Sequence, residues 1–223
     1  MSAAPVPAAL GLGARRGLLV DYGGVLTTDP FASFEACGVA EGLAPGAVRA
    51  AMAPGGPVSA TFAELERGAL GDAEFERRFA AGLGLAPERA AGLRGRLFAG
   101  MRSDHATRNL VRALRALGVR TALLSNSAGT GGYDRELLGE LFDDVVISGE
   151  VGLRKPDPAI YRLAARRLEL PPDALVLVDD LEENLVPARA LGIAGVLHRD
   201  AASTAAELQE LLGLRLPAAL AAR

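Results

Sequence analysis

The sequence predicts an α/β fold, with a doubly wound, Rossmann-like parallel sheet as its core and an α-helical cap inserted after the first strand. Three observations favour this class. Short, uniformly apolar segments recur along the chain, and most of them end at polar residues. Amphipathic helical patterns separate these segments, as in sheets that helices cover on both faces. One long stretch after the first apolar segment contains helical patterns alone, which is typical of an inserted cap.

The apolar segments predict the strands of the sheet. They lie at 17–20, 121–124, 145–147, 175–178 and 194–197. Because these segments do not alternate with polar residues, we expect both faces of the sheet to be covered. Apolar residues at helical spacing predict the covering helices, which lie near 109–117, 157–168, 181–191 and 204–212. Asp157 is in the position of an N-cap for the second of these helices.

The strand pattern disappears between Asp29 and about Ser103. Helical patterns replace it near 45–53, 60–67, 72–82 and 87–99, and glycines and prolines interrupt them. A helical block at this point would cover the carboxyl ends of the strands, where ligands bind in such sheets. We therefore predict three parts, namely a flexible tail at 1–16, a core of 17–29 and 103–223, and a helical cap at 30–102.

The composition excludes several classes of protein. The chain has 223 residues, of which 50% are hydrophobic and 23% are charged, and its net charge is −3. It is therefore neither disordered nor collagen-like. The single cysteine, Cys37, cannot form an intrachain disulfide, which favours a reducing compartment, and we predict a cytoplasmic location. The apolar runs fall short of the ~18 residues of a membrane span. The mildly acidic balance predicts no nucleic acid or membrane partner. We also expect a small-molecule substrate and a monomer or homodimer.

Polar residues cluster where the predicted strands end. Asp21, the pair Ser125 and Asn126, and the pair Asp179 and Asp180 each follow a strand directly. The carboxyl ends of parallel strands lie along one edge, so these groups should converge on one crevice. Close carboxylates repel one another, and a site made of oxygen ligands suits Mg²⁺. A carboxylate there can also act as a nucleophile toward a phosphoryl group.

Four segments give the chain a resemblance to a known family. They are LLVDYGGVL at 18–26, ALLSNS at 122–127, GLRKPDPAIY at 152–161 and LVLVDDLEENL at 175–185. In this order and spacing the chain resembles the haloacid dehalogenase-like hydrolase superfamily from about Gly17 to Leu212. The GGP segment at 55–57 and the run at 179–193 most resemble the subgroup that includes the amino-terminal phosphatase domain of soluble epoxide hydrolase.

The resemblance implies catalytic roles for residues at matching positions. Asp21 matches the nucleophile that forms an aspartyl-phosphate. Ser125 matches the hydroxyl that binds the phosphoryl group, with Asn126 beside it. Lys155 matches the lysine that holds nucleophile and phosphate in position, and it is the single lysine among 24 basic residues.

The resemblance also implies a Mg²⁺ site. Asp21 and Asp180 match carboxylates that ligate the metal ion, and Asp179 matches a second ligand or a water-mediated contact. The backbone carbonyl two residues after the nucleophile, here that of Gly23, completes the set. We expect Asn184, in the helix that follows Asp179 and Asp180, to stabilise the loop at this acidic pair.

Gly23 departs from the family pattern. Phosphatases of this family have a second aspartate at this position, which protonates the leaving oxygen and then activates water. General acid–base catalysis is worth ~10²–10⁴-fold. Turnover of ordinary phosphate esters should therefore fall by that order unless another group, such as a residue of the cap, takes over.

Three hypotheses follow from these observations. The first is a Mg²⁺-dependent phosphatase that acts on a small phosphorylated metabolite through Asp21. The second is a pseudoenzyme that binds phosphate or a metabolite as a regulatory module, and its motivation is Gly23. The third is dehalogenation, in which halide leaves without a proton, although the Asp179 and Asp180 pair favours a metal and therefore the first two.

Overall fold

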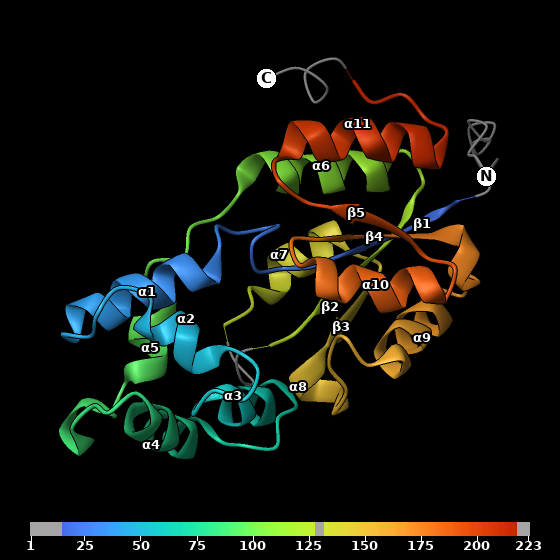
Figure 1. Cartoon of the computed structure of the whole chain (residues 1–223). Coiled ribbons are helices and arrows are strands. Elements are labelled where there is room, and N and C mark those ends of the chain that lie inside the picture. Colours follow the sequence, from blue (N-terminus) through green and yellow to red (C-terminus); the bar gives the residue numbers. More distant parts are fainter. Residues whose placement is uncertain (1–14, 128–131, 218–223) are drawn as a thin grey trace.

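The computed structural model describes residues 15–127 and 132–217. These residues form one five-stranded sheet with the strand order β3-β2-β1-β4-β5, and all neighbouring strands are parallel (Figure 1). Its strands are β1 (Gly17–Val20), β2 (Arg120–Ser125), β3 (Asp144–Ile147), β4 (Leu175–Asp179) and β5 (Ala194–Leu197). The predicted fold class is therefore confirmed, and each strand falls on one of the five apolar segments.

Two groups of helices cover the two faces of the sheet. On one face, α6 (His105–Ala116), α7 (Arg135–Leu141) and α11 (Ala201–Leu212) share a buried apolar cluster with the strands. On the other face, α9 (Pro158–Arg167) and α10 (Glu182–Ala190) share a second cluster. Neighbouring strand residues alternate between the clusters: Leu18 belongs to the first and Leu19 to the second. This alternation explains why the strands are apolar throughout.

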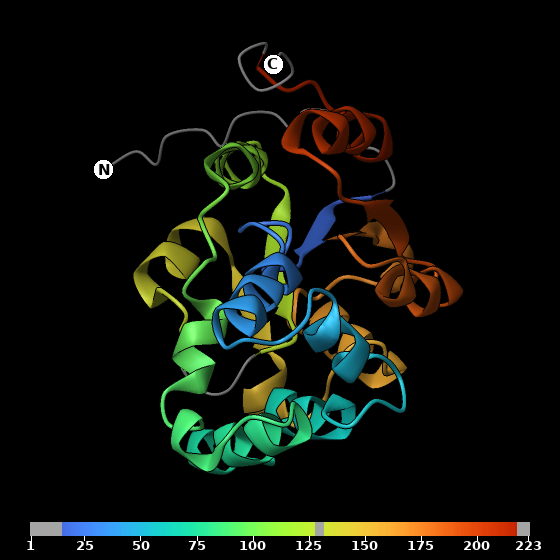
Figure 2. The ribbon, with the colours of Figure 1, turned by 60° about the vertical axis from the view of Figure 1, so that its left-hand side comes forward.

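The helices that follow β1 form a group of their own at one end of the sheet, and we refer to them as the cap helices (Figure 2). They are α1 (Pro30–Ala40), α2 (Ala47–Met52), α3 (Ser59–Glu66), α4 (Asp72–Gly82) and α5 (Leu93–Phe98). Their apolar core contains Phe34, Phe75, Phe79 and Leu97, and it is separate from the two clusters of the sheet.

The two connections between the cap helices and the sheet run side by side. Thr27 and Ser103 form an antiparallel bridge. Thr28 N donates to Arg102 O at 2.8 Å, and Asp104 N donates to Leu26 O at 2.9 Å. The chain therefore leaves and re-enters the sheet unit at one place, close to the predicted limits of the cap.

Helix α1 was not predicted from the sequence. Its N-cap is Asp29, whose side chain accepts a hydrogen bond from Phe31 N, and Pro30 is its first residue. Its sequence, PFASFEACGVA, is apolar or small almost throughout, so it lacks the polar face on which amphipathic spacing depends. The short helices α7 and α8 (Ser148–Val151) were also missed. The helix expected at 87–99 is divided, because Gly92 adopts a left-handed conformation before α5.

The limit of the predicted tail needs a correction. Residues 1–14 lie outside the described residues, but Arg15 and Arg16 are held against the sheet. Arg16 N donates to Ala174 O at 2.8 Å, and Arg120 N donates to Arg16 O at 3.0 Å. The backbone pairing of β1 with its neighbours therefore continues to Arg16, which sequence polarity alone does not indicate. In the described part of the chain, none of the helices is long and apolar enough for a membrane span.

The N-cap of α11 provides a stability test. Asp200 Oδ1 accepts a hydrogen bond from Ser203 N at 2.8 Å. Asp200→Ala should lower the free energy of unfolding by about 1 kcal/mol, because the amide loses its partner. For a chain of this size this corresponds to a loss of roughly 2–4 °C in Tm. Glu207→Ala, an exposed change in the same helix, is the control and should stay within about 0.5 kcal/mol of the wild type. Equal losses in both variants would contradict the role of the cap.

Candidate active site

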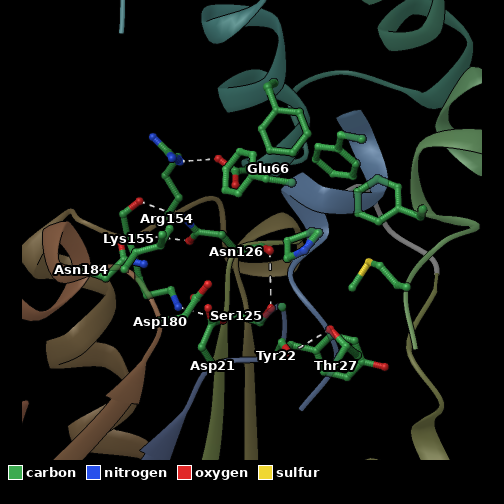
Figure 3. Close-up of a pocket in the computed structure, with 18 of the residues that line it drawn as sticks. Asp21, Tyr22, Thr27, Glu66, Ser125, Asn126, Arg154, Lys155, Asp180 and Asn184 are labelled. Carbon is green, nitrogen blue, oxygen red and sulfur yellow. Dashed lines mark hydrogen bonds and ion pairs between the residues drawn. The ribbon is translucent and has the colours of Figure 1, made fainter. Parts of the chain in front are cut away.

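The polar residues at the strand ends surround one cavity of about 680 Å³ between the sheet and the cap helices. Asp21 follows β1, Ser125 ends β2 and Asp180 follows β4, so the parallel sheet brings all three to the same edge. Asn126 and Lys155 also line the cavity. Figure 3 shows that these side chains come from separate elements and point toward one another. The convergence that the sequence predicts is therefore present in the structure.

Lys155 is buried between two carboxylates. Its Nζ atom lies 2.8 Å from Asp21 Oδ1 and 2.6 Å from Asp179 Oδ2, and its side chain is fully buried. Burial by itself would lower the pKa of Lys155, but the charges of Asp179 and Asp21 outweigh this effect and raise it. These charges favour the ammonium form, and its third proton remains for a further acceptor.

Asp179 acts as an anchor for this pair. While Oδ2 contacts Lys155, Oδ1 accepts hydrogen bonds from Leu181 N at 3.0 Å and from Asn184 Nδ2 at 2.8 Å. The predicted bracing role of Asn184 is thus present in the structure. Both oxygens of Asp179 already have partners, so this residue is better placed to position Lys155 than to bind a ligand in the cavity.

Asn126 holds the backbone of Lys155. Its Nδ2 donates to Lys155 O at 3.0 Å, and its Oδ1 accepts from Lys155 N at 2.8 Å. One side-chain amide thereby links the end of β2 to the segment before α9. Asp157 caps α9 by accepting a hydrogen bond from Ala159 N at 2.8 Å. Both ends of the short Lys155 segment are fixed in this way.

Ser125 is buried beneath an aromatic pair. Its hydroxyl lies 2.9 Å from the hydroxyl of Tyr133, and burial raises the pKa of Tyr133. The ring of Tyr133 packs edge-on against that of Tyr22, with 4.9 Å between centroids. Because Tyr133 keeps its proton, it can donate to Ser125. The Ser125 hydroxyl itself donates only a long hydrogen bond to Asn126 O, at 3.4 Å, which a phosphoryl oxygen could replace.

The site contains more negative than positive charge. The carboxylates of Asp21, Asp179 and Asp180 offer oxygens within 4.8 Å of one another, and Lys155 supplies one positive charge among them. Burial raises the pKa of Asp180 to about 7, and repulsion from Asp21 and Asp179 adds to this effect. Burial likewise raises the pKa of Asp21, although Lys155 opposes it. A site of carboxylate oxygens with an excess of negative charge fits Mg²⁺.

Two glycines after Asp21 have different surroundings. Gly24 has φ of +74°, and a Cβ atom there would lie 2.2 Å from Asp180 Oδ2. Glycine is therefore required at this position, since Asp180 packs directly on the loop. At Gly23, a Cβ atom would meet only the ring of Pro30, with Cγ at 3.2 Å. Gly23 lines the cavity and brings no side chain to it.

The cap helices supply two features that the sequence analysis missed. The first is an apolar lining, made by Phe31, Phe34, Met52, Phe62, Phe98 and Met101. The second is Glu66 at the end of α3, whose carboxylate lies 2.7 Å from Arg154 of the Lys155 segment. Arg154 directly precedes Lys155 in the quoted segment, so the sequence offered it as a site candidate. Glu66 lies in an ordinary helical pattern, and nothing in that pattern indicates a place in the cavity.

Comparisons with known proteins agree with this arrangement. A model of the haloacid dehalogenase-like hydrolase family matches residues 16–192. Bifunctional epoxide hydrolase 2 of Rattus norvegicus is 33% identical over 114 residues, which are 48% of this chain, and the match spans about a fifth (21%) of the rat protein. A sesquiterpene phosphatase of Aspergillus oryzae is 28% identical over 158 residues, covering 70% of this chain and 81% of that protein.

A solved structure extends the likeness to the fold. It is a haloacid dehalogenase family enzyme of Bacteroides thetaiotaomicron in complex with magnesium and inorganic phosphate, with a TM-score of 0.58 and 20% identity. The alignment covers 83% of this chain and 94% of that one. The family model matches most of the chain, and the strand order and the converging motifs agree with that match. The chain belongs to the haloacid dehalogenase-like hydrolase family.

Proposed function

We propose that this hydrolase is a Mg²⁺-dependent phosphatase that works through an aspartyl-phosphate at Asp21. The observation that carries the proposal is the ion pair between Asp21 and the buried Lys155, at 2.8 Å, beside the carboxylate of Asp180. The relative that is named a phosphatase and matches 70% of the chain supports the same reaction class.

The reaction has two steps. A carboxylate oxygen of Asp21 attacks phosphorus, the bond from phosphorus to the ester oxygen breaks, and the aspartyl-phosphate forms. Water then attacks the same phosphorus, the bond to Asp21 breaks, and inorganic phosphate leaves. Lys155 and Ser125 hold the phosphoryl oxygens through charge and hydrogen bonding, since each has a proton to donate toward the cavity.

Asp21, Asp180 and the backbone carbonyl of Gly23 are the groups that would hold Mg²⁺. When bound, the ion would neutralise charge on the phosphoryl group and on the carboxylates around it. Asp179 contributes indirectly by holding Lys155. The magnesium and phosphate complex of the Bacteroides enzyme supports this assignment.

The apolar lining of the cavity favours a substrate with an apolar organic part. Aromatic rings and methionines line the cavity on the side of the cap helices, next to the charged Glu66 and Arg94, whereas Asp21, Lys155 and Asp180 lie on the side of the sheet. A phosphate ester of a medium-sized hydrocarbon would match both halves. The name of the relative from Aspergillus oryzae, a sesquiterpene phosphatase, is consistent with such a substrate.

Gly23 motivates one alternative. A chain without the second aspartate would bind phosphate and even become phosphorylated, but would hydrolyse the phosphoenzyme slowly, and it would then act as a binding or regulatory module. This alternative differs from the proposal in the fate of the phosphate on Asp21.

The first prediction concerns the nucleophile. With Mg²⁺ and a phosphate ester, the wild type should release phosphate and should yield a phosphoprotein after acid quenching, whereas Asp21→Asn should do neither, because the amide is a poor nucleophile. The exposed Asp173→Asn change is the control and should match the wild type. A stable phosphoprotein without phosphate release would favour the regulatory alternative. No phosphate release above the Asp21→Asn level and no phosphoprotein would contradict both.

The second prediction concerns the metal. Mg²⁺ at about 100 times its dissociation constant should stabilise the wild type by roughly 2.7 kcal/mol. For a chain of this size, each kcal/mol shifts Tm by roughly 2–4 °C. Asp180→Asn should lose most of this shift, because a carboxylate of the site is gone, whereas Glu183→Gln should keep it, since Glu183 is exposed and lies outside the carboxylate cluster. Differential scanning fluorimetry measures these shifts in Tm. Equal Mg²⁺-induced shifts in the two variants would argue against the assigned site.

The third prediction concerns the apolar lining. Along a series of linear alkyl phosphates, kcat/KM should rise with chain length, because each buried methylene contributes up to ~0.8 kcal/mol, or about fourfold. Met101→Gln should reduce this slope. Val39→Gln, at an apolar cap residue that is 52% exposed and does not line the cavity, should not. A preference for sugar phosphates over alkyl phosphates would refute this substrate class.

A further inference from the structure

We propose that Glu66, at the end of α3, is the general acid and base of this phosphatase and takes over the proton transfers for which Gly23 has no side chain. The inference rests on the proposed phosphatase function and extends it to a residue of the cap helices. It is carried by the position of Glu66 in the cavity, by its burial and by its contacts.

Glu66 is a buried carboxylate of the cavity that is neither the proposed nucleophile nor part of the metal cluster. Four carboxylates line the cavity among the described residues: those of Asp21, Glu66, Asp180 and Glu183. Asp21 is the proposed nucleophile, Asp180 belongs to the metal cluster, and Glu183 is exposed. Glu66 is 7% exposed and comes from the cap helices. Figure 3 shows it on the opposite side of the cavity from Asp21, with Asn126 between them.

The backbone at Glu66 is fixed to the sheet unit. The hydroxyl of Ser148, at the start of α8, donates to Glu66 O and accepts a hydrogen bond from Ser127 N at 2.8 Å. Two residues further on, Gly68 has φ of +69°, and a Cβ atom there would lie 2.4 Å from Gly149 O. Only glycine allows this close approach. The end of α3 is therefore held against α8, and Glu66 is held at the cavity.

The side chain of Glu66 retains the capacity to exchange a proton. Its Oε2 atom lies 2.7 Å from Arg154 Nε and forms an ion pair with it, and the two atoms have no other hydrogen-bond partner among the described residues. A carboxylate has about four lone-pair sites, so one ion-pair contact leaves this group able to bind a further partner. The leaving oxygen of a substrate, and then a water molecule, would bind there.

The protonation of Glu66 suits both steps. Burial raises the pKa of this carboxyl to about 7, against the opposing charges of Arg154 and Lys155, and the charge of Asp21 adds to the rise. Near neutral pH both forms of the group are then populated, which is the condition for donating a proton in one step and accepting one in the next.

The proton balance of the two steps is simple. In the first, the protonated carboxyl of Glu66 gives its proton to the ester oxygen as the bond from that oxygen to phosphorus breaks, so the product leaves as an alcohol. In the second, the carboxylate of Glu66 takes a proton from the water that attacks the aspartyl-phosphate. Phosphate leaves, Asp21 is again a carboxylate, and Glu66 is again protonated.

A purely structural role is the competing explanation. The ion pair with Arg154 connects the cap helices to the Lys155 segment, and its loss could impair closure of the site. Such a defect would slow all substrates alike. A lost proton donor instead slows substrates in proportion to the basicity of their leaving group, so the dependence on the leaving group separates the two roles.

The experiment compares Glu66→Gln with Glu64→Gln, a partly exposed residue of the same helix that pairs with Arg78 and does not line the cavity. With an alkyl phosphate, Glu66→Gln should lower kcat by about 10²–10⁴-fold, whereas Glu64→Gln should not. With p-nitrophenyl phosphate, whose leaving group needs no proton, Glu66→Gln should still give a burst of nitrophenol close to one equivalent of enzyme. Turnover after the burst should be slow, because the base for water is missing.

A rescue variant completes the test. Adding Gly23→Asp to Glu66→Gln should restore turnover of the alkyl phosphate by at least tenfold, since a carboxylate returns to the cavity and a Cβ atom at this position meets only the ring of Pro30. Should Glu66→Gln fail to fold, Glu66→Asp, which withdraws the carboxylate by one methylene, should show the same dependence on the leaving group.

Three outcomes would overturn the assignment. A loss of less than threefold in Glu66→Gln with the alkyl phosphate, or loss of the burst with p-nitrophenyl phosphate without rescue by Gly23→Asp, would exclude Glu66 as the acid and base while the phosphatase activity of the wild type stands. A wild type that releases no phosphate and forms no phosphoprotein would remove the proposed function, and the role of Glu66 with it.

Discussion

The buried lysine between Asp21 and Asp179 is the interaction on which the site depends. It joins the ends of β1 and β4 to the segment before α9 through contacts of 2.8 and 2.6 Å. Removing one partner would leave an uncompensated buried charge, which typically costs ~3–5 kcal/mol. Arginine cannot replace it, because a planar guanidinium is broader than the ammonium that fits between the two carboxylates. The single lysine of an arginine-rich chain therefore lies where its shape is indispensable.

This charged layer determines how the remaining residues are arranged. Asp180 lies close to the carboxylates of Asp21 and Asp179, and it fits there because Gly24 has no Cβ atom to collide with it. The side-chain amide of Asn126 is hydrogen-bonded to the backbone of Lys155, and that of Asn184 to the carboxylate of Asp179. Both predicted residues therefore position other residues of the site. The carboxylates of the nucleophile and metal cluster lie on the sheet side of the cavity, whereas the cap side is mainly apolar and brings Glu66 and Arg94 as charged residues.

The sequence was informative where a signal is local. The five strands and the residues that follow them were predictable, because apolar runs and strand-end polarity are properties of neighbouring residues, and a parallel sheet makes them converge. Helix α1 was missed because it has no polar face. The anchoring role of Asp179 and the place of Glu66 depend on contacts between segments distant in the chain, Ser148 with Glu66 among them. The hydrophobic periodicity of the sequence gives no information about such contacts.

The position of the acid and base also affects when the reaction can proceed. An aspartate at position 23 would lie on the loop of the nucleophile and remain beside it whatever the cap helices do. Glu66 is held at the cavity by the contact of the end of α3 with Ser148 and Gly149. In the proposed mechanism, proton transfer to the ester oxygen and from water therefore depends on the position of the cap helices. A substrate whose apolar part fills the space beneath these helices would favour that position, and proton transfer would then be coupled to substrate binding.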